Sequence, residues 1–167
     1  MYEIYERLTA VPSEKIRGDI VLDHLQRERG RFRAWTSGGE EVRVFLERGQ
    51  TLRVGEILRA ACGACFVVAG AEEEVTWAGT DDWQLFSRAC YHLGNRHTKV
   101  QIGARWLRIS RDHVLEDMLR DLGLQTRDEV AVFIPESGAY AGKGHAHHHG
   151  DHDHGDHHDH SHGHHHH

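Results

Sequence analysis

Histidine is concentrated at the carboxyl end of the chain, and its side chain is a metal ligand. Of the 18 histidines in 167 residues, 14 lie between residue 145 and the end, interspersed with aspartate, glycine and serine. Neutral imidazole suits Ni²⁺, Cu²⁺ and Zn²⁺, and aspartate adds oxygen ligands. We expect several ions to bind with little selectivity, because a flexible chain fixes no geometry. The predicted ligands are His145, His147, His148, His149, His152 and His154.

This tail, residues 143–167, contains no Leu, Ile, Val or aromatic residue. It cannot bury enough apolar surface to offset the entropy of ordering, so we expect it to be disordered when metal-free. A purification tag is the alternative interpretation. A tag is normally an unbroken histidine run, and this tail is interrupted throughout. The alternative therefore stays open mainly for the final four histidines.

Two further histidines stand where rigid elements are expected to hold them. His97 ends the sequence GNRH, between a predicted helix and a predicted strand. His113 lies in the first turn of a second predicted helix, where the helix dipole favours the neutral imidazole that can bind a metal. Asp112 beside it offers a carboxylate. On spacing alone such histidines are more often surface or capping residues, so both interpretations stay open.

The three cysteines give a weaker signal. Cys62 and Cys65 form a single CxxC pair in a predicted hairpin turn, whereas a structural zinc site needs four ligands. Capture of Zn²⁺ or Cu⁺ by this pair across a dimer is the alternative to a purely structural role. Cys90 is expected in the hydrophobic core, on the apolar stripe of a predicted helix.

The remaining histidines, His24 and His92, are interpreted as surface residues. His24 precedes a basic run that we interpret as a solvated face, with docking to an acidic partner surface as its functional alternative. The run contains Arg27, Arg29, Arg31 and Arg33.

The candidate ligands lie on a chain whose hydrophobic pattern changes near residue 80, from that of strands to that of helices. The first 78 residues alternate apolar and polar side chains, as in Tyr2–Ile4 and Val42–Val44, which predicts a small all-β unit with no long helix. After residue 80 the period changes to that of a helix. Asp81 is the predicted N-cap and Gly94 the predicted left-handed stop. The predicted buried stripe is Trp83, Phe86, Cys90 and Leu93.

Two strands are predicted around Gly103 within residues 99–109, followed by a second helix that starts near Ser110 or Asp112 and ends at Gly123. The last predicted strand covers 129–134. The predicted buried face of the second helix is Val114, Leu115, Met118, Leu119 and Leu122. The resulting order, β-α-β-β-α-β, is that of a ferredoxin-like domain. We therefore predict an α+β protein with an all-β domain at 1–74, a ferredoxin-like domain at 75–142 and the tail at 143–167.

Composition excludes several classes of protein. The formal charge of −6 argues against a nucleic-acid binder, because binding to a phosphate backbone requires a basic surface. No apolar run is long enough to cross a membrane, and the N-terminus lacks a secretory signal, so we expect a cytoplasmic protein. No phosphate-binding loop, nucleophile elbow or HExxH motif is present, which argues against an enzyme.

Three sequence blocks together resemble the UreE family of urease accessory proteins, which are nickel metallochaperones. They are GNRHTKVQI (94–102), DHVLEDML (112–119) and FIPESGAY (133–140), followed directly by the histidine-rich tail. The segment VLDHLQRERGRFR (21–33) fits the family's first domain more loosely. The resemblance covers essentially the whole chain.

The resemblance implies a homodimer whose two His97 side chains share one Ni²⁺, with Zn²⁺ or Cu²⁺ able to bind as well. It implies that His113 is a further ligand and that the N-terminal domain binds peptides. It also implies urease apoprotein and an accessory GTPase as partners. Some members carry a histidine two positions before the equivalent of His113. Arg111 stands there in this chain, so the auxiliary site is expected to be weaker.

Two other functions remain open. A storage protein would buffer Ni²⁺ or Zn²⁺ through the tail alone, without delivery. A peptide-binding assembly chaperone would act through the β domain, with metal incidental. Because replacing His97 should matter only for delivery, that residue separates the first alternative from a metallochaperone.

Overall fold

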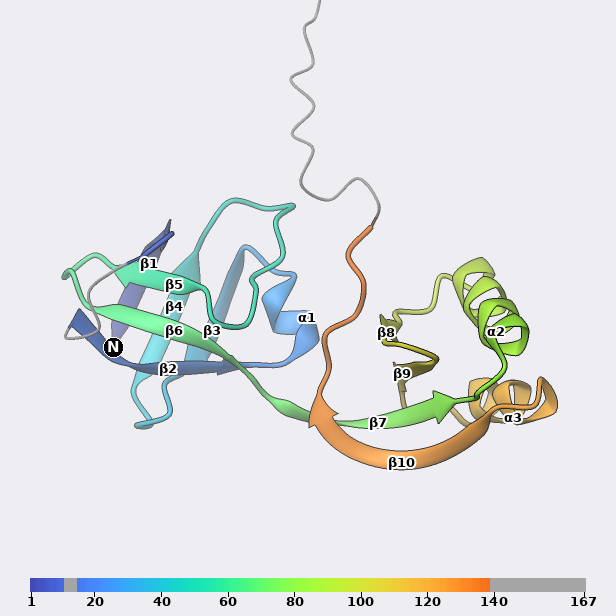
Figure 1. Ribbon diagram of the computed structural model, residues 1–167. Coiled ribbons are helices and arrows are strands. Elements are labelled where there is room, and N and C mark those ends of the chain that lie inside the picture. The colour runs from blue at the N-terminus through green and yellow to red at the C-terminus, as the bar shows by residue number, and fades with distance from the viewer. Residues whose placement is uncertain (11–14, 139–167) are drawn as a thin grey trace, which may run out of the picture.

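The structure, a computed structural model, describes residues 1–10 and 15–138, which form two domains joined near residue 71 (Figure 1). The N-terminal domain is a six-stranded sheet with the order β2-β6-β5-β1-β4-β3. The absence of a long helix before residue 80 is confirmed for the described part of this domain. Its elements are β1 (Tyr2–Leu8), β2 (Ile16–Leu22), α1 (His24–Arg27), β3 (Arg31–Trp35), β4 (Glu41–Phe45), β5 (Ile57–Ala60) and β6 (Cys65–Gly70).

Alternation builds the core of this domain. In β4 the side chains of Val42 and Val44 are buried and that of Arg43 is exposed, as the period-two pattern predicts. Ile4 of β1 is fully buried in the same cluster. The alternation alone did not predict β2, because its sequence carries a glycine and ends in three consecutive apolar residues.

The C-terminal domain has the predicted β-α-β-β-α-β order and the strand order β10-β7-β9-β8, with every pairing antiparallel. This is the ferredoxin-like arrangement, and the α+β prediction is confirmed. Both helices pack on one face of the sheet through a cluster of buried apolar side chains. The elements are β7 (Glu72–Gly79), α2 (Trp83–Asn95), β8 (Gln101–Ile102), β9 (Trp106–Ser110), α3 (His113–Asp121) and β10 (Gln125–Val132).

Both predicted ends of the first long helix are wrong. Asp82, not Asp81, is the N-cap of α2, and its carboxylate accepts two backbone N–H groups of the first turn at 2.7 and 3.2 Å. Gly94 lies inside the helix, which continues to Asn95. A glycine near a helix end is a common stop signal, but here the left-handed residue comes three positions later.

The buried stripe of α2 also differs from the prediction. Phe86, Ala89 and Leu93 face the sheet, whereas the side chain of Trp83 is 60% exposed. At 100° per residue, Trp83 is rotated roughly 80° from the centre of this stripe.

None of the helices in residues 1–10 and 15–138 is long and apolar enough to cross a membrane.

The second long helix, α3, starts after its N-cap Asp112 and stops before Gly123, in agreement with the predicted start and end, and Gly123 is left-handed with φ of 98°. The predicted burial of Val114 is wrong, because this side chain is 63% exposed. Glu116 is buried instead, at 6% exposed. A carboxylate inside an apolar stripe needs hydrogen-bond partners that the sequence does not reveal. The other predicted positions are fully or partly buried, namely Leu115, Met118, Leu119 and Leu122.

The domains meet at a junction where the predicted solvated basic run is partly buried. His24 and Arg27 of α1 are 9% and 3% exposed, so the surface interpretation is wrong for both. His24 Nδ1 lies 2.7 Å from Oε1 of Glu73 in β7, and Arg27 donates a hydrogen bond to the carbonyl of Phe133. The rest of the run is exposed as predicted, at Arg29, Arg31 and Arg33. Because β7 begins at Glu72, the division predicted at 74/75 falls inside this strand.

Candidate metal site on the C-terminal domain

His97 occupies an unusual backbone position at the carboxyl end of α2. Its side chain is exposed and its φ is +54°, in the left-handed region that favours glycine. Its N–H donates to the carbonyl of Gly94 at 3.0 Å, and the N–H of Thr98 donates to that of Leu93 at 3.2 Å. These two bonds form a Schellman motif, with His97 at the position where helices usually place glycine.

The other long helix of the domain provides the direct comparison. At the end of α3, Gly123 donates to Arg120 at 2.9 Å and Leu124 donates to Leu119 at 3.0 Å, the same two bonds. Gly123 adopts φ of 98° without a Cβ clash, whereas His97 has a Cβ in the same region. The chain therefore holds a strained residue where glycine would fold more easily. Such strain typically marks a side chain kept for function.

Replacing His97 by glycine is expected to raise the free energy of unfolding by about 0.5 kcal/mol, because relief of the left-handed strain outweighs the larger entropy of the unfolded chain. The matched change at the other helix end, Gly123→Ala, is expected to lower it by about 1 kcal/mol. Urea unfolding measures both changes. His97→Ala, which keeps the Cβ, is the control, and a His97→Gly variant no more stable than it would contradict the strain.

His113 is the first residue of α3 and its side chain is exposed, as the prediction of a first-turn histidine requires. The neighbouring Asp112 is committed to the helix, because one carboxylate oxygen accepts the backbone N–H groups of Val114 and Leu115 at 3.0 and 3.1 Å. One oxygen of Asp112 therefore caps the helix, and only the second oxygen could bind a metal.

Both histidines lie at the same end of the C-terminal sheet. Ser110, the last residue of β9, pairs with Val75 near the start of β7, and α3 begins three residues later. The helix α2 leaves the far end of β7 and runs back, which returns His97 to the end where β7 starts. Loops from separate elements thus present His97 and His113 on one side of the domain.

A buried carboxylate fixes the turn that carries His113. Thr76 Oγ1 of β7 donates to Oε1 of Glu116 at 2.5 Å, and Arg111 Nε donates to the same oxygen at 3.2 Å. Arg120 donates to the other oxygen at 3.3 Å. The hydrogen bond from Thr76, followed by the Arg111 charge, lowers the pKa of Glu116 against the opposing effect of burial. This network binds the first turn of α3 to the sheet.

The change Glu116→Gln is expected to lower the free energy of unfolding at pH 7 by about 1–2 kcal/mol, because two arginines lose a charged acceptor. The folded pKa lies below the unfolded value of about 4.3. The contribution is therefore full above pH 4.3 and lost as the pH falls through the folded value, so wild type and variant converge in acid. Urea titrations between pH 7 and pH 3 test this. Asp117→Asn, which removes an exposed partner of Arg120, is expected to change little.

The segment after β10 leads the chain to the His97 loop. Ile134 donates its N–H to the side chain of Gln101 at 3.1 Å, and Glu136 donates to the carbonyl of Val100 at 2.8 Å. Val100 is three residues after His97. The predicted tail ligands from His145 to His154 lie outside the described residues. What the structure places is Glu136, seven residues before that tail, which is hydrogen-bonded to the segment that follows His97.

An exposed stripe on α2 ends at the same loop. Trp83 and Tyr91 are 60% and 66% exposed and lie two turns apart, with Ser87 between them. Gly94 continues this stripe, and a Cβ there would meet no atom within 4 Å. Glycine inside a helix costs about 1 kcal/mol relative to alanine, and no contact among residues 1–10 and 15–138 requires it here. A smooth surface beside exposed aromatic rings is typical of an interface between proteins.

Within residues 1–10 and 15–138, no three His, Cys, Asp or Glu side chains are grouped closely enough to hold a metal ion. His97 and His113 therefore do not belong to a complete metal site within these residues of one subunit. The predicted hairpin position of the CxxC pair is confirmed, with Cys62 exposed and Cys65 buried. Burial raises the pKa of the Cys90 thiol, which makes it a poor ligand.

Comparison with known proteins covers both domains. Two family models match the chain: "UreE urease accessory protein, N-terminal domain" over residues 3–70 and "UreE urease accessory protein, C-terminal domain" over residues 73–167. A protein named Urease accessory protein UreE from Marinomonas sp. is 57% identical over 146 residues, covering 87% of this chain and 99% of that protein. The proteins of that name from Alteromonas mediterranea and Psychromonas ingrahamii are 50% and 44% identical, covering 84% and 87% of this chain and 91% and 95% of theirs.

Proposed function

Because this chain belongs to the UreE family of urease accessory proteins, we propose that it is a nickel-binding metallochaperone that delivers Ni²⁺ to urease apoprotein during assembly of the urease active site. An accessory protein of this family is not itself an enzyme. Delivery requires no covalent chemistry from the chain. It requires ligands that hold the ion and then release it.

The observation that carries the proposal is the exposed imidazole of His97 on a left-handed residue. The backbone there is fixed by the two hydrogen bonds of the Schellman motif, so the ring is presented from a rigid position. A single imidazole binds a divalent ion weakly. The left-handed backbone of His97 destabilises the folded chain, so a histidine is kept there only if its side chain has a function. Metal coordination by the imidazole is such a function.

We infer that the α2 stripe forms a homodimer interface that brings two copies of His97 to one ion. In a twofold dimer the same stripe meets its own copy, so Trp83 and Tyr91 would be covered from both sides. A Cβ on Gly94 would meet no atom of the described residues within 4 Å, so this glycine would let the two helices approach closely just before His97. The ion would then bind between subunits, through one imidazole from each.

The remaining ligands would come from His113 and from the tail. Glu136 is hydrogen-bonded to Val100, three residues after His97, and the tail follows it in the sequence. His145 follows Glu136 by nine residues, which reach at most about 30 Å. Two fixed and several movable ligands would complete an octahedral or tetragonal shell that suits Ni²⁺, while Zn²⁺ and Cu²⁺ would compete for it. Movable ligands can be replaced one at a time by those of urease or of an accessory GTPase.

Titration with Ni²⁺ and Zn²⁺, followed by native mass spectrometry of the intact assembly, tests the proposal. We expect the full chain to bind several ions per dimer, and a chain truncated after Gly142 to retain one Ni²⁺ per dimer. If the truncated chain bound no Ni²⁺, the tail alone would be the metal site and a storage function would replace delivery. Repeating the titration at pH 8 and pH 5.5 should show weaker binding in acid, because protons compete for each imidazole.

A further inference from the structure

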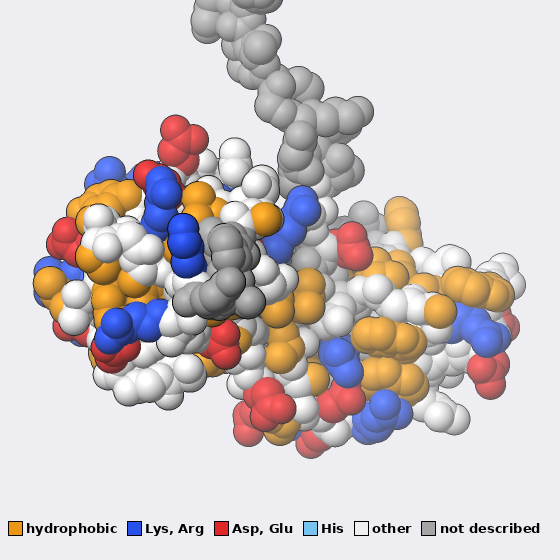
Figure 2. Space-filling model, turned by 60° about the vertical axis from the view of Figure 1, so that its left-hand side comes forward, with side chains coloured by type: hydrophobic (Ala, Val, Ile, Leu, Met, Phe, Trp, Pro, Cys, Tyr) orange, Lys and Arg blue, Asp and Glu red, His pale blue; other side chains and the backbone are white. Residues whose placement is uncertain are grey.

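The face of the C-terminal sheet that the helices do not cover carries an alternating set of arginines and tryptophans. We call Arg127, Trp77, Arg108 and Trp106 the Arg–Trp ladder. Trp77 of β7 pairs with Arg127 of β10 on one side and with Arg108 of β9 on the other, and Trp106 is two residues before Arg108 in the same strand. Figure 2 shows hydrophobic side chains lying next to Lys or Arg side chains on the surface of this domain.

Two glycines let the indole rings of the ladder lie across the backbone. A Cβ on Gly79 would come within 2.4 Å of Cη2 of Trp77, and a Cβ on Gly103 within 2.0 Å of Cε2 of Trp106. Both distances are far below any real contact, so no other residue would fit without moving the ring. The indole rings can therefore occupy these places only because glycine stands at both strand ends.

The ladder holds one arginine ready for an anion. The guanidinium carbon of Arg127 lies 3.8 Å from the centre of the Trp77 ring, and Arg127 has no hydrogen bond or ion pair within the described part of the chain. Arg108 lies 5.0 Å from the Trp106 ring and is already paired with Glu129 at 2.8 Å. Stacking fixes the plane of Arg127 and leaves its in-plane N–H donors free, which is the arrangement that binds carboxylates bidentately.

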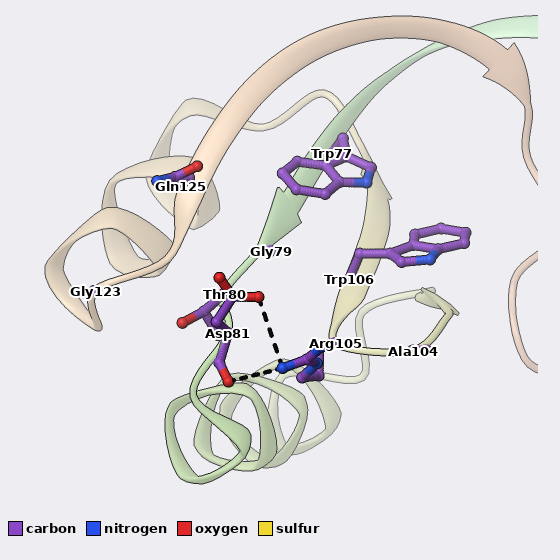
Figure 3. A pocket seen from close by; sticks show the side chains of 9 residues that line it. All are labelled: Trp77, Gly79, Thr80, Asp81, Ala104, Arg105, Trp106, Gly123 and Gln125. Atoms are coloured by element: carbon purple, nitrogen blue, oxygen red, sulfur yellow. Dashed lines mark hydrogen bonds and ion pairs between the residues drawn. The ribbon is translucent and has the colours of Figure 1, made fainter.

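A hollow of about 280 Å³ adjoins the ladder at the end of β7. Figure 3 shows both indoles on the same side of the strands, with Arg105 at the rim and joined to Asp81. Arg105 NH1 donates to the carbonyl of Asp81 at 3.1 Å, and the backbone of Arg105 is left-handed with φ of +61°. Gln125 of β10 lines the opposite side. The hollow is large enough for one or two side chains of a partner.

We propose that the Arg–Trp ladder and this hollow form a docking surface for an acidic segment of a partner protein. Arg127 takes a carboxylate of that segment, and the indole-lined hollow takes a neighbouring apolar or aromatic side chain. Tryptophan and arginine are the residue types that carry most binding energy at interfaces. A protein segment fits better than a nucleic acid, because one arginine that is unpaired within the described residues can hold a single carboxylate, whereas binding to a phosphate backbone requires several cationic contacts.

The test pans a phage-displayed library of random dodecapeptides on the full-length protein and measures the binding of the enriched peptides. We expect enrichment of peptides that combine Asp or Glu with an aromatic residue. Arg127→Glu is expected to weaken their binding about tenfold or more. The control is Arg31→Glu, the same charge change on an exposed strand residue of the other domain, which should leave the binding of these peptides unchanged.

A second variant tests the ladder without changing its charge. Gly103→Ala pushes the Trp106 ring from its position and is expected to weaken the same peptides severalfold, with Arg127 intact. The absence of enriched acidic peptides, or equal binding by the Arg127→Glu and Arg31→Glu variants, would overturn the proposal. Nickel titration of the same variants should match wild type. A failed docking test with normal nickel binding therefore leaves the metallochaperone proposal standing.

Discussion

Replacing His97 by alanine is expected to lower the nickel affinity of a chain ending at Gly142 by about 100-fold or more, equivalent to about 2.7 kcal/mol. One substitution removes two ligands, because the proposed site takes one imidazole from each subunit. Isothermal titration calorimetry measures the affinity. In cells at limiting nickel, the full-length variant is expected to lose most of the urease activation that wild type supports.

The control for this change is His92→Ala, on the same helix but off the exposed stripe, which should leave the affinity unchanged. Tail truncation provides the opposite comparison. If His97→Ala left urease activation intact while truncation abolished it, the storage function would be correct and the delivery site would not be at His97.

If the α2 stripe joins two subunits as proposed, the change Tyr91→Arg is expected to convert this dimer to a monomer and to lower nickel affinity as far as His97→Ala does. Tyr91 is 66% exposed within its subunit, so the arginine fits the monomer but would place two like charges and a bulky side chain at the twofold contact. Sedimentation velocity and nickel titration of the chain ending at Gly142 measure the two effects together.

Val130→Arg is the matched control, because Val130 is 63% exposed on β10, away from the α2 stripe. It should remain dimeric and bind nickel normally. A Tyr91→Arg variant that stayed dimeric, or that became monomeric with full nickel affinity, would show that α2 does not join the two copies of the site.

Hydrophobic periodicity predicted the order of elements in the C-terminal domain and the all-β character of the N-terminal domain, because it reports which side chains are buried. It located helix ends less well. Gly94 resembles a helix stop in sequence, but the hydrogen bonds of the last turn are satisfied only when His97 is the left-handed residue. The sequence does not indicate that His97 is the left-handed residue, because Gly94, three residues earlier, is the more usual residue at a helix end.

Predictions about single side chains were wrong where long-range partners decide burial. His24 and Arg27 belong to a charged sequence, yet they contact Glu73 and the Phe133 carbonyl of the other domain in a buried junction. Glu116 is buried because Thr76 supplies a donor 40 residues away in sequence. Such pairs form only when the two segments are folded together, so no local pattern predicts them.

The candidate site shows the same division. Sequence alone placed His97 in a loop after a helix and His113 in a first helical turn, and both positions are confirmed. Their roles as ligands stay predictions, as do those of the tail histidines. The exposed α2 stripe was missed because Trp83 fits a buried stripe at three-residue spacing equally well. A glycine inside an otherwise regular helix was the available signal.

If His97 binds the metal as proposed, the hydrogen bond from Glu136 to Val100 tethers the segment that precedes the tail near the ion and so raises the effective concentration of the tail there. A segment tethered a few residues from its binding site meets that site at millimolar local concentration, whatever the protein concentration in the cell. A tail histidine displaced from nickel would therefore rebind faster than any free ligand arrives. Only a recipient held against the protein for long enough could take the ion, which would keep nickel from escaping to bulk solvent between donor and acceptor.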